Sequence, residues 1–382
     1  MKSNYDILGN HIRLIDTRNR ESITDRVLGI NIDKIFMPSV ANVIGTDLSK
    51  YKLITKGKFA CNPMHVGRDE RLPVALYDEE EPAIVSPAYF MFEVIDNSIL
   101  NEDYLMMWFR RPEFDRICWL HTDGSVRGGI TWNDICRLEL PIPPIEKQIE
   151  IVNSYKAITE RIALKQKIND NLEATLTAIF KKMFVEDESV EFTSKKLHEL
   201  TKTIDNRGKT PPNDNVETPY PLIEIAALRT NGRIATYRNC IKFVTEETYN
   251  SWFRSGHPKQ KDILMSTVGS LAELKLFWGD KGSIAQNIVA FRCHDTTLSM
   301  YLYQYLLRKQ HELAAYEIGS VQASIKVSQV IEYDIDVPPQ DLLELFDKIA
   351  TLFTEQIYQN EDDIDICHKL CNLIFQRLTP QD

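Results

Sequence analysis

Two long stretches of the chain repeat apolar residues at the spacing of a helix. Each stretch follows a Pro-Pro pair, Pro143-Pro144 in the first and Pro338-Pro339 in the second. In the first, apolar side chains recur three and four residues apart, at Ile145, Ile149, Val152, Tyr155, Ile158 and Ile162 and again at Ile168, Leu172, Leu176, Ile179 and Met183. The second shows similar spacing, at Leu342, Leu345, Ile349, Leu352, Gln356, Cys367, Leu370 and Ile374. So narrow a stripe is typical of the seam of a coiled coil.

The length and composition of these stretches predict two rigid rods. Neither contains glycine or an internal proline, and about 40 residues at a rise of about 1.5 Å each make a helix of roughly 60 Å. Proline stops a preceding strand and suits the first turn of a helix, which explains the Pro-Pro pair at each junction. We expect the two rods to pack on each other.

The sequence before each rod alternates short apolar runs with turn residues. In the first half these runs are "VLGINI", "YKLITKGKFACNP" and "AIVSPAYFMFEV", and in the second half "YPLIEIAAL", "KDILMSTVGS" and "SIAQNIVAFRC". This pattern predicts strands of a mixed or antiparallel sheet in each half. Residues 103–118 and 298–316 have the spacing of amphipathic helices.

The chain carries the same seam twice. "GSVRGGITWNDICRLELPIPP" begins at Gly124 and "GSVQASIKVSQVIEYDIDVPP" begins at Gly319, 195 residues later, and "IFKKMF" at Ile179 matches "IFQRLT" at Ile374. A repeat of this length fits two tandem modules of ordinary domain size. We therefore divide the chain into a first module at 1–142, a first rod at 143–188, a second module at 189–337 and a second rod at 338–382. The predicted fold class is α+β: two mixed α/β modules, each followed by a long helix, with the two helices packing as an antiparallel coiled coil.

Composition places the chain among globular proteins of a reducing compartment. It has 382 residues, of which 43% are hydrophobic and 26% charged, enough for two substantial cores. No basic region followed by an apolar run opens the chain, and no stretch approaches about 18 uninterrupted apolar residues, so we expect neither secretion nor membrane spanning. Seven cysteines without a CxxC pair agree with the cytoplasm.

The net charge of −10 gives no support to nucleic-acid binding, but it does not exclude it. Much of the excess acid lies in residues 337–382, which hold three Lys or Arg against nine Asp or Glu. The two modules are near balance and can still present local basic patches.

A search for catalytic motifs finds none. "RGKTPP" at Arg207 lacks the glycine five residues before Gly208 that a phosphate-binding loop needs. "CHKLC" places Cys367 and Cys371 one helical turn apart on the apolar stripe, with no second ligand pair, which favours a core role over a metal site. We therefore predict no catalytic residue, no bound cofactor and no metal in this chain.

The repeated seam and the rods resemble the specificity subunits of type I restriction-modification systems. The matching segments are "RLELPIPPIEKQIEIV", "EYDIDVPPQDLLELF" and "LEATLTAIFKKMF" around the rods, with "IDNRGKTPP", "KDILMSTVG" and "SIAQNIVAF" in the order of the family's target-recognition modules. "GRDERLPVA" and "AIVSPAYFMF" match in the first module, so the resemblance covers the whole chain. The second seam departs from the first by carrying Gln340 and Asp341 where Ile145, Glu146, Lys147 and Gln148 stand.

This resemblance implies a DNA-reading subunit without catalytic activity. Each module would be a target-recognition domain for one half of a split site in double-stranded DNA, and the rods would hold the two at a fixed separation. The rods would also dock two methyltransferase subunits and, through that complex, restriction and translocase subunits. S-adenosylmethionine, ATP and Mg would then be bound by the partner subunits.

The DNA contacts are predicted from chemistry, because polar side chains on loops can reach phosphates or base edges. In the first module the candidates are Arg18, Arg20, Arg68, Arg71 and Arg127. In the second they are Arg207, Lys209, Thr210, Lys259, Lys261, Gln286 and Gln322, the last being the counterpart of Arg127.

Two other interpretations share some of these features. A non-catalytic coiled-coil scaffold with two protein-binding modules would also have the rods and the acidic end. A fragment of a fused restriction-methylation enzyme is the third interpretation. The bases read and the spacer between the half-sites do not follow from the sequence.

Overall fold

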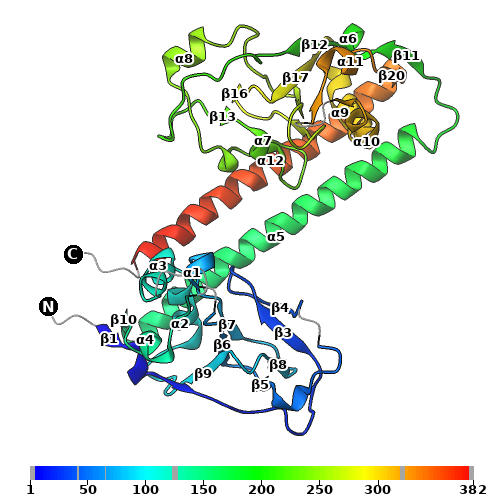
Figure 1. Cartoon of the computed structure of the whole chain (residues 1–382). Coiled ribbons are helices and arrows are strands. Elements are labelled where there is room, and N and C mark those ends of the chain that lie inside the picture. The colour runs from blue at the N-terminus through cyan, green and yellow to red at the C-terminus, as the bar shows by residue number, and fades with distance from the viewer. Residues whose placement is uncertain (1–4, 41–42, 65, 123–127, 319–322, 378–382) are drawn as a thin grey trace. The chain divides into compact units, whose positions relative to one another are not determined.

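The computed structural model describes residues 5–40, 43–64, 66–122, 128–318 and 323–377 (Figure 1). It divides into two compact units, one of residues 1–160 with 367–382 and one of residues 161–366. The two predicted rods are single helices, α5 (Ile145–Phe184) with 40 residues and α12 (Gln340–Arg377) with 38. Both helices contribute residues to both units.

The first module contains two four-stranded sheets. One has the order β2 (Ile12–Leu14), β9 (Phe90–Val94), β6 (Lys58–Cys61) and β7 (Val74–Tyr77), with every pair antiparallel. The other has the order β4 (Phe36–Pro38), β3 (Val27–Ile30), β8 (Ala83–Val85) and β5 (Lys52–Ile54), and its β3–β8 pair is parallel. A short antiparallel ribbon of β1 (Tyr5–Ile7) and β10 (Glu139–Pro141) joins the beginning of the module to its end. The prediction of a mixed or antiparallel sheet is confirmed, since the module has one sheet of each kind.

The helix predicted over 103–118 is in fact two helices, α2 (Glu102–Phe109) and α3 (Pro112–Leu120). Proline at the first position of α3 disfavours a helical conformation for the residue before it, and Arg111 is extended at φ −72° and ψ 141°. The two helices bury a cluster of aromatic rings against the sheet: Phe109 lies 5.8 Å from Phe59 and 4.9 Å from Phe114 between ring centroids. Two short helices, α1 (Val66–Asp69) and α4 (Trp132–Cys136), complete the module.

The second module repeats the first sheet. Its antiparallel order is β12 (Thr201–Ile204), β17 (Ile288–Cys293), β14 (Ile263–Ser266) and β15 (Leu274–Leu276). The ribbon of β11 (Thr193–Lys196) and β20 (Asp334–Val337) again joins the two ends of the module. Two further pairs are formed by β13 (Leu222–Ile223) with β16 (Ser283–Ile284) and by β18 (Glu317–Ile318) with β19 (Ser324–Ile325).

The described residues of the second module form six short α-helices: α6 (Leu197–Leu200), α7 (Ile225–Leu228), α8 (Glu246–Ser251), α9 (Ser299–Arg308), α10 (Gln310–Ala314) and α11 (Val327–Val330). The helix predicted over 298–316 is split into α9 and α10, because Lys309 leaves helical geometry at φ −94° and ψ 10°. In both modules a tyrosine of the helix after the main sheet donates to the ribbon. The Tyr104 hydroxyl lies 3.1 Å from the carbonyl of Pro141, and the Tyr301 hydroxyl lies 2.5 Å from that of Asp336.

Within the unit of residues 161–366, α5 and α12 run antiparallel, as predicted. Phe180 packs on Phe346 with 5.6 Å between ring centroids, Asn169 bonds Asn360, and Arg161 pairs with Asp363. Residue numbers thus decrease along α5 while those of the contacting residues increase along α12. In the unit of residues 1–160 and 367–382, the Tyr155 and Phe375 rings lie 5.2 Å apart.

The predicted seam of α5 is confirmed at its centre, whereas that of α12 is wrong by one residue over 342–352 and correct at Cys367. Val152, Ile162 and Leu176 are buried, although Ile149 and Ile168 at the edge of the stripe are exposed. On α12 the buried residues include Leu343, Phe346, Ala350, Ile357 and Ile364, while the predicted Leu345 and Leu352 are 50% and 66% exposed. Because apolar residues lie next to each other at 342–343 and 345–346, spacing alone allowed two phases of the stripe.

Some of the apolar residues that were predicted for the α12 seam lie instead on its exposed face, where they belong to a second apolar series. Leu345, Leu352, Ile366 and Leu373 follow at seven-residue multiples and are all about half exposed or more. Cys367 and Cys371 are buried at 5% and 7% exposure, which confirms their core role. No helix in the part of the chain described above has an apolar stretch long enough to cross a membrane.

Candidate nucleic-acid interface

Two loops of the second module enclose a small basic pocket. The pocket measures about 300 Å³ and is lined by Asn206, Lys209, Trp252 and Arg254. Lys209 and Arg254 are exposed, and Trp252 is 37% exposed although it is among the most hydrophobic residue types. Two cations, an aromatic face and an amide at one opening are the groups that bind phosphates and stack on or contact bases.

Hydrogen bonds from Asn206 hold the two loops of this pocket together. Its side-chain amide donates to the carbonyl of Gly256 at 2.8 Å and accepts from the backbone of Ser255 at 2.9 Å. The Ser255 hydroxyl donates to the carbonyl of Asp205 at 2.6 Å, and Gly256 turns the chain with φ +79°. Asn206 is therefore a positioning residue, which leaves Lys209, Trp252 and Arg254 to face a ligand.

Arg207, the first candidate of this loop, is bound to its own neighbour. Its guanidinium meets both oxygens of Asp205 at 2.6–2.9 Å. Burial raises the pKa of the Asp205 carboxyl, but the hydrogen bonds from Arg207 outweigh it and the net pKa is lowered. The Asp205 carboxyl is therefore ionised at neutral pH, and the Arg207 guanidinium, 34% exposed, keeps part of its donor capacity for other groups. Thr210 is exposed on the same loop.

The remaining candidates of the second module differ in their surroundings. Lys259 and Gln286 are exposed on loops, so their side chains are accessible to a ligand. Lys261 is 20% exposed, and its ammonium lies 2.8 and 2.9 Å from the two carboxylate oxygens of Asp347 on α12. Lys261 thus fastens the module to the helix, so it is a poorer candidate for DNA than the exposed loop residues. Gln322 lies outside the described residues.

Among the described candidates of the first module, Arg18 and Arg71 pair with different carboxylates. Arg18 pairs with Asp16 at 2.6 Å and donates to the carbonyl of Lys50 at 2.7 Å, whereas Arg20 is exposed. Arg71 is half exposed, 3.4 Å from Asp33. Arg127 lies outside the described residues, and so does the side chain of Arg68.

A wide groove of about 800 Å³ adjoins Arg71. It is also lined by Arg110, Arg116 and Trp119, all exposed, together with acidic groups at Asp33, Asp69 and Glu70. At its edge Lys34 is buried, with its ammonium 2.6 Å from Asp115 and 2.7 Å from the carbonyl of Leu72. The mixture of charges makes this groove less suited to a polyanion than the pocket of the second module.

Sequence reasoning missed Trp252 and Arg254, although a signal for them was present. Both stand in "SWFRSGHPK", a polar loop marked by glycine and proline from which only Lys259 was chosen. An aromatic residue and an arginine in the same loop are the combination that binds nucleic acid.

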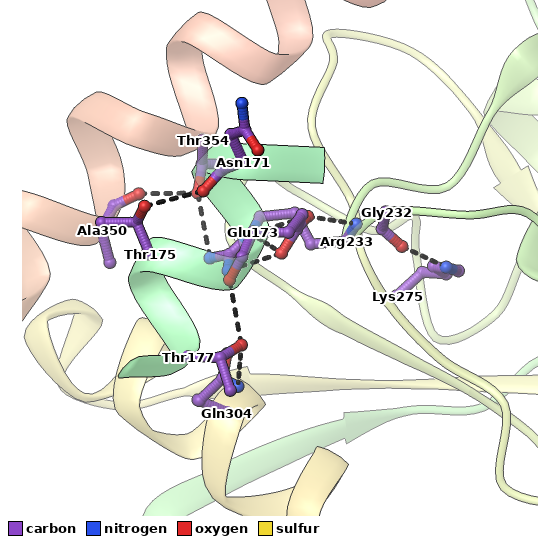
Figure 2. Close-up of polar contacts among 10 residues, drawn as sticks. All are labelled: Asn171, Glu173, Thr175, Thr177, Gly232, Arg233, Lys275, Gln304, Ala350 and Thr354. Atoms are coloured by element: carbon purple, nitrogen blue, oxygen red, sulfur yellow. Dashed lines mark hydrogen bonds and ion pairs between the residues drawn. The ribbon is translucent and has the colours of Figure 1, made fainter. Parts of the chain in front are cut away.

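A buried ion pair links the second module to the long helices α5 and α12. Arg233, 2% exposed, lies between Glu173 of α5 and Thr354 of α12 (Figure 2). Its guanidinium meets the Glu173 carboxylate at 2.9–3.1 Å, its backbone N–H donates to the same carboxylate at 2.7 Å, and a longer bond of 3.4 Å reaches the Thr354 hydroxyl. The guanidinium also lies 5.7 Å from the centre of the Tyr303 ring.

The loop that carries Arg233 is held by a second buried cation. Lys275 of β15 donates to the carbonyl of Thr230 at 2.5 Å. It also donates to the carbonyl of Gly232 (Figure 2). Gly232 adopts φ +81°, a conformation that strongly favours glycine and that places the next N–H on Glu173. Burial lowers the pKa of Lys275, while Glu173 and Glu273 act in the opposite direction. The orientation of the module on α5 and α12 is therefore set by groups that are buried and hydrogen-bonded.

Nothing in the described part of the chain brings three or more His, Cys, Asp or Glu side chains together as a metal site.

Comparison with known proteins finds similarity at the level of structure. No protein-family model matches the sequence, and no curated protein matches it. The structure of the type I restriction-modification S subunit from M. genitalium aligns over 100% of this chain and 97% of its own, with a TM-score of 0.60 and 14% sequence identity.

Two further structures align with lower scores. One, described as showing complex assembly and conformational transition of the type I R-M system, covers 98% of this chain and 96% of its own at TM-score 0.45 and 15% identity. The HsdS subunit from Thermoanaerobacter tengcongensis covers 98% and 95% at TM-score 0.37 and 15% identity. The likeness to the first structure shows a shared fold over the whole length of this chain.

Proposed function

We propose that this chain, which has the fold of a type I restriction-modification S subunit, is the DNA sequence-recognition subunit of such a system. Each module reads one half of a split target in double-stranded DNA, and α5 and α12 hold the two readers apart. Methyltransferase subunits dock on the chain and, through them, restriction subunits join the complex. Catalysis, with its S-adenosylmethionine, ATP and Mg, belongs to the partner chains.

The observation that carries this proposal is the duplicated plan of the chain. Each module has a four-stranded antiparallel sheet of matching order, is joined at its two ends by a ribbon, and is followed by a long helix. Two readers on matched supports suit a target made of two separate half-sites. The exposed cations and tryptophan of the second module are of the kind that meets a DNA backbone and its bases.

The outer face of α12 supports the docking of a methyltransferase subunit. Leu345 and Leu352 lie one above the other on that face, at 50% and 66% exposure, with Ile366 two heptads further along. Apolar residues at heptad spacing are what a partner helix would bury.

Purification with its methyltransferase partner tests the proposal. We expect the complex, but not the isolated chain, to methylate DNA at a target of two half-sites separated by a fixed gap, as read by sequencing of methylated bases. A complex that binds protein partners but leaves DNA unmethylated and is not retained on any DNA sequence would support the scaffold interpretation and overturn this one.

A further inference from the structure

The seam between α5 and α12 contains a layer where two buried asparagine amides meet among apolar side chains. Asn169 and Asn360 are 6% and 2% exposed, and the side-chain amide of Asn360 donates to the carbonyl oxygen of Asn169 at 2.7 Å. Asn169 donates in turn to Glu361 at 2.9 Å, and Lys165 donates to the carbonyl oxygen of Asn360 at 3.0 Å. We call Lys165, Asn169, Asn360 and Glu361 the amide layer; both of its buried amides are hydrogen-bonded through oxygen and nitrogen.

The amide layer is the exception in a regular heptad pattern. The α5 seam includes Tyr155, Ile162, Asn169, Leu176 and Met183, seven residues apart, with one amide among apolar side chains. The α12 seam has an all-apolar series, Leu343, Ala350, Ile357, Ile364 and Cys371, and a second series, Phe346, Phe353, Asn360, Cys367 and Ile374. Sliding one helix by seven residues would again place apolar residues against apolar residues in most positions. Within the seam, the two buried amides would lose each other as partners, and the Arg233 bridge from Glu173 to Thr354 would also be broken.

The position of the layer relates it to the duplication. Lys165 and Asn360 are 195 residues apart, the same separation as that between Ile179 and Ile374 in the repeated segment. They therefore occupy equivalent positions in the two copies. In an antiparallel pair of equivalent helices, equivalent positions meet only at the midpoint. The layer marks the centre about which the duplicated halves of the seam are arranged.

The layer is also connected to the second module. Arg238 lies 2.6 Å from the Glu361 carboxylate that accepts from Asn169, and it pairs with Asp365 at 2.7 Å. On the other side, Lys165 and Arg161 both reach Asp363, at 2.7 and 3.3 Å. The position of the second module along the helices is thus tied to the register at which the amides meet.

We propose that the amide layer fixes the register of α5 and α12 and thereby selects the number of base pairs between the two half-sites. This inference rests on the proposed function, because only a reader of a split site has such a gap. A polar residue at one core position of a coiled coil specifies register, since other registers leave a buried amide without a partner. A slip of one heptad moves the helices by about 10 Å, which corresponds to about 3 bp of duplex.

The first test measures the gap directly. The complex of the full chain with its methyltransferase subunit is given a library of DNA in which the spacer between the two half-sites varies from none to about 12 bp. This range covers slightly more than one turn of the duplex. We compare the natural chain with Asn169→Leu/Asn360→Leu and with the control Asn171→Leu/Asn372→Leu, which changes two exposed amides of the same helices. We expect the natural chain and the control to methylate one spacer length. The double leucine variant should methylate a second spacer about 3 bp away, at least about tenfold more than the natural chain does.

The second test reads the register without DNA. Cysteines at Arg161 and Asp363, which meet at 3.3 Å, report the native register, and cysteines at Arg161 and either Gln356 or Leu370 report a slip of seven residues. The native cysteines are buried or half-buried, so mild oxidation favours the exposed pairs. In the natural background only the first pair should cross-link, and in the leucine background the slipped pair should form as well. If the leucine variant does not fold, Asn169→Ala/Asn360→Ala, whose side chains are smaller than the amides, takes its place.

The outcomes separate this inference from the proposed function. One register and one spacer in the folded leucine or alanine variant would overturn the role of the amide layer. Absence of methylation at every split site with the natural chain would overturn the proposed function, and the cross-links would then still show whether the amides set the register.

Discussion

Replacement of Arg233 by alanine should strongly destabilise the second module. The change removes the guanidinium from a carboxylate that is itself mostly buried, since Glu173 is 24% exposed. Breaking a fully buried pair costs about 3–5 kcal/mol, because the remaining charge is left without its partner. Glu173 retains some contact with water and its bond from the backbone N–H of residue 233, so we expect the lower part of that range, about 3 kcal/mol. The lost contact with Tyr303 adds about 0.5–1 kcal/mol.

Denaturant unfolding followed by circular dichroism measures this loss, and hydrogen exchange of the amides at 230–236 locates it. Two variants serve as controls. Arg238→Ala removes a guanidinium that is one-third exposed, and surface pairs of this kind contribute about 0–1 kcal/mol. Arg233→Met/Glu173→Met removes both charges of the pair and should recover most of the stability, because neither partner is left as an unpaired buried charge.

The comparison between these variants decides the matter. If Arg233→Ala shifts the unfolding midpoint no further than Arg238→Ala, the buried pair does not hold the module on the helices. If the double methionine variant is as unstable as Arg233→Ala, the loss comes from packing and the electrostatic reasoning is wrong.

Three other predictions follow from the surfaces and the buried groups. Leu352→Asp should abolish copurification with the methyltransferase subunit while leaving the fold intact, because Leu352 is 66% exposed; retention of the partner by this variant would move docking elsewhere. Trp252→Ala and Arg254→Ala should weaken DNA binding, and the arginine variant should reduce the slope of log affinity against log salt by about one if Arg254 meets a phosphate, as salt titration would show. Burial lowers the pKa of His257, although its bond to the Tyr249 carbonyl acts in the opposite direction. The unfolded chain therefore binds the proton first, so stability should be full above about pH 6.5 and fall as pH decreases below that value, and His257→Gln should flatten this part of the curve in pH-dependent unfolding.

Much of the fold could be predicted because it depends on long, regular patterns. The rods carry apolar residues over some forty positions, and strands such as β14 and β17 begin with apolar runs, Ile-Leu-Met and Ile-Val-Ala-Phe. The errors arose where a single residue decides. Pro112 breaks a predicted helix, and neighbouring apolar residues at 345–346 left the phase of the α12 seam open until packing against α5 selected Phe346.

The candidate site was harder to predict, because its residues meet only after folding. Asn206 joins two loops that are about 50 residues apart in the sequence, and no local pattern shows that Trp252 and Arg254 will face Lys209. Lys261 has the same local signature as Lys259, yet it meets Asp347, 86 residues away. The residue types of a loop therefore do not show which of its cations stay exposed and which form ion pairs within the protein.

The central claim, that each module reads its own half-site, is tested most directly by a methylation map of a chimera. Residues 1–142, which end just after the β1–β10 ribbon, are replaced by the first module of another type I S subunit, and α5, the second module and α12 are kept. Sequencing of DNA methylated by the complex should show one half of the target exchanged, while the other half and the spacer stay as they are with the natural chain. A map in which both halves change together, or in which the bases stay and only the spacer changes, would contradict the account.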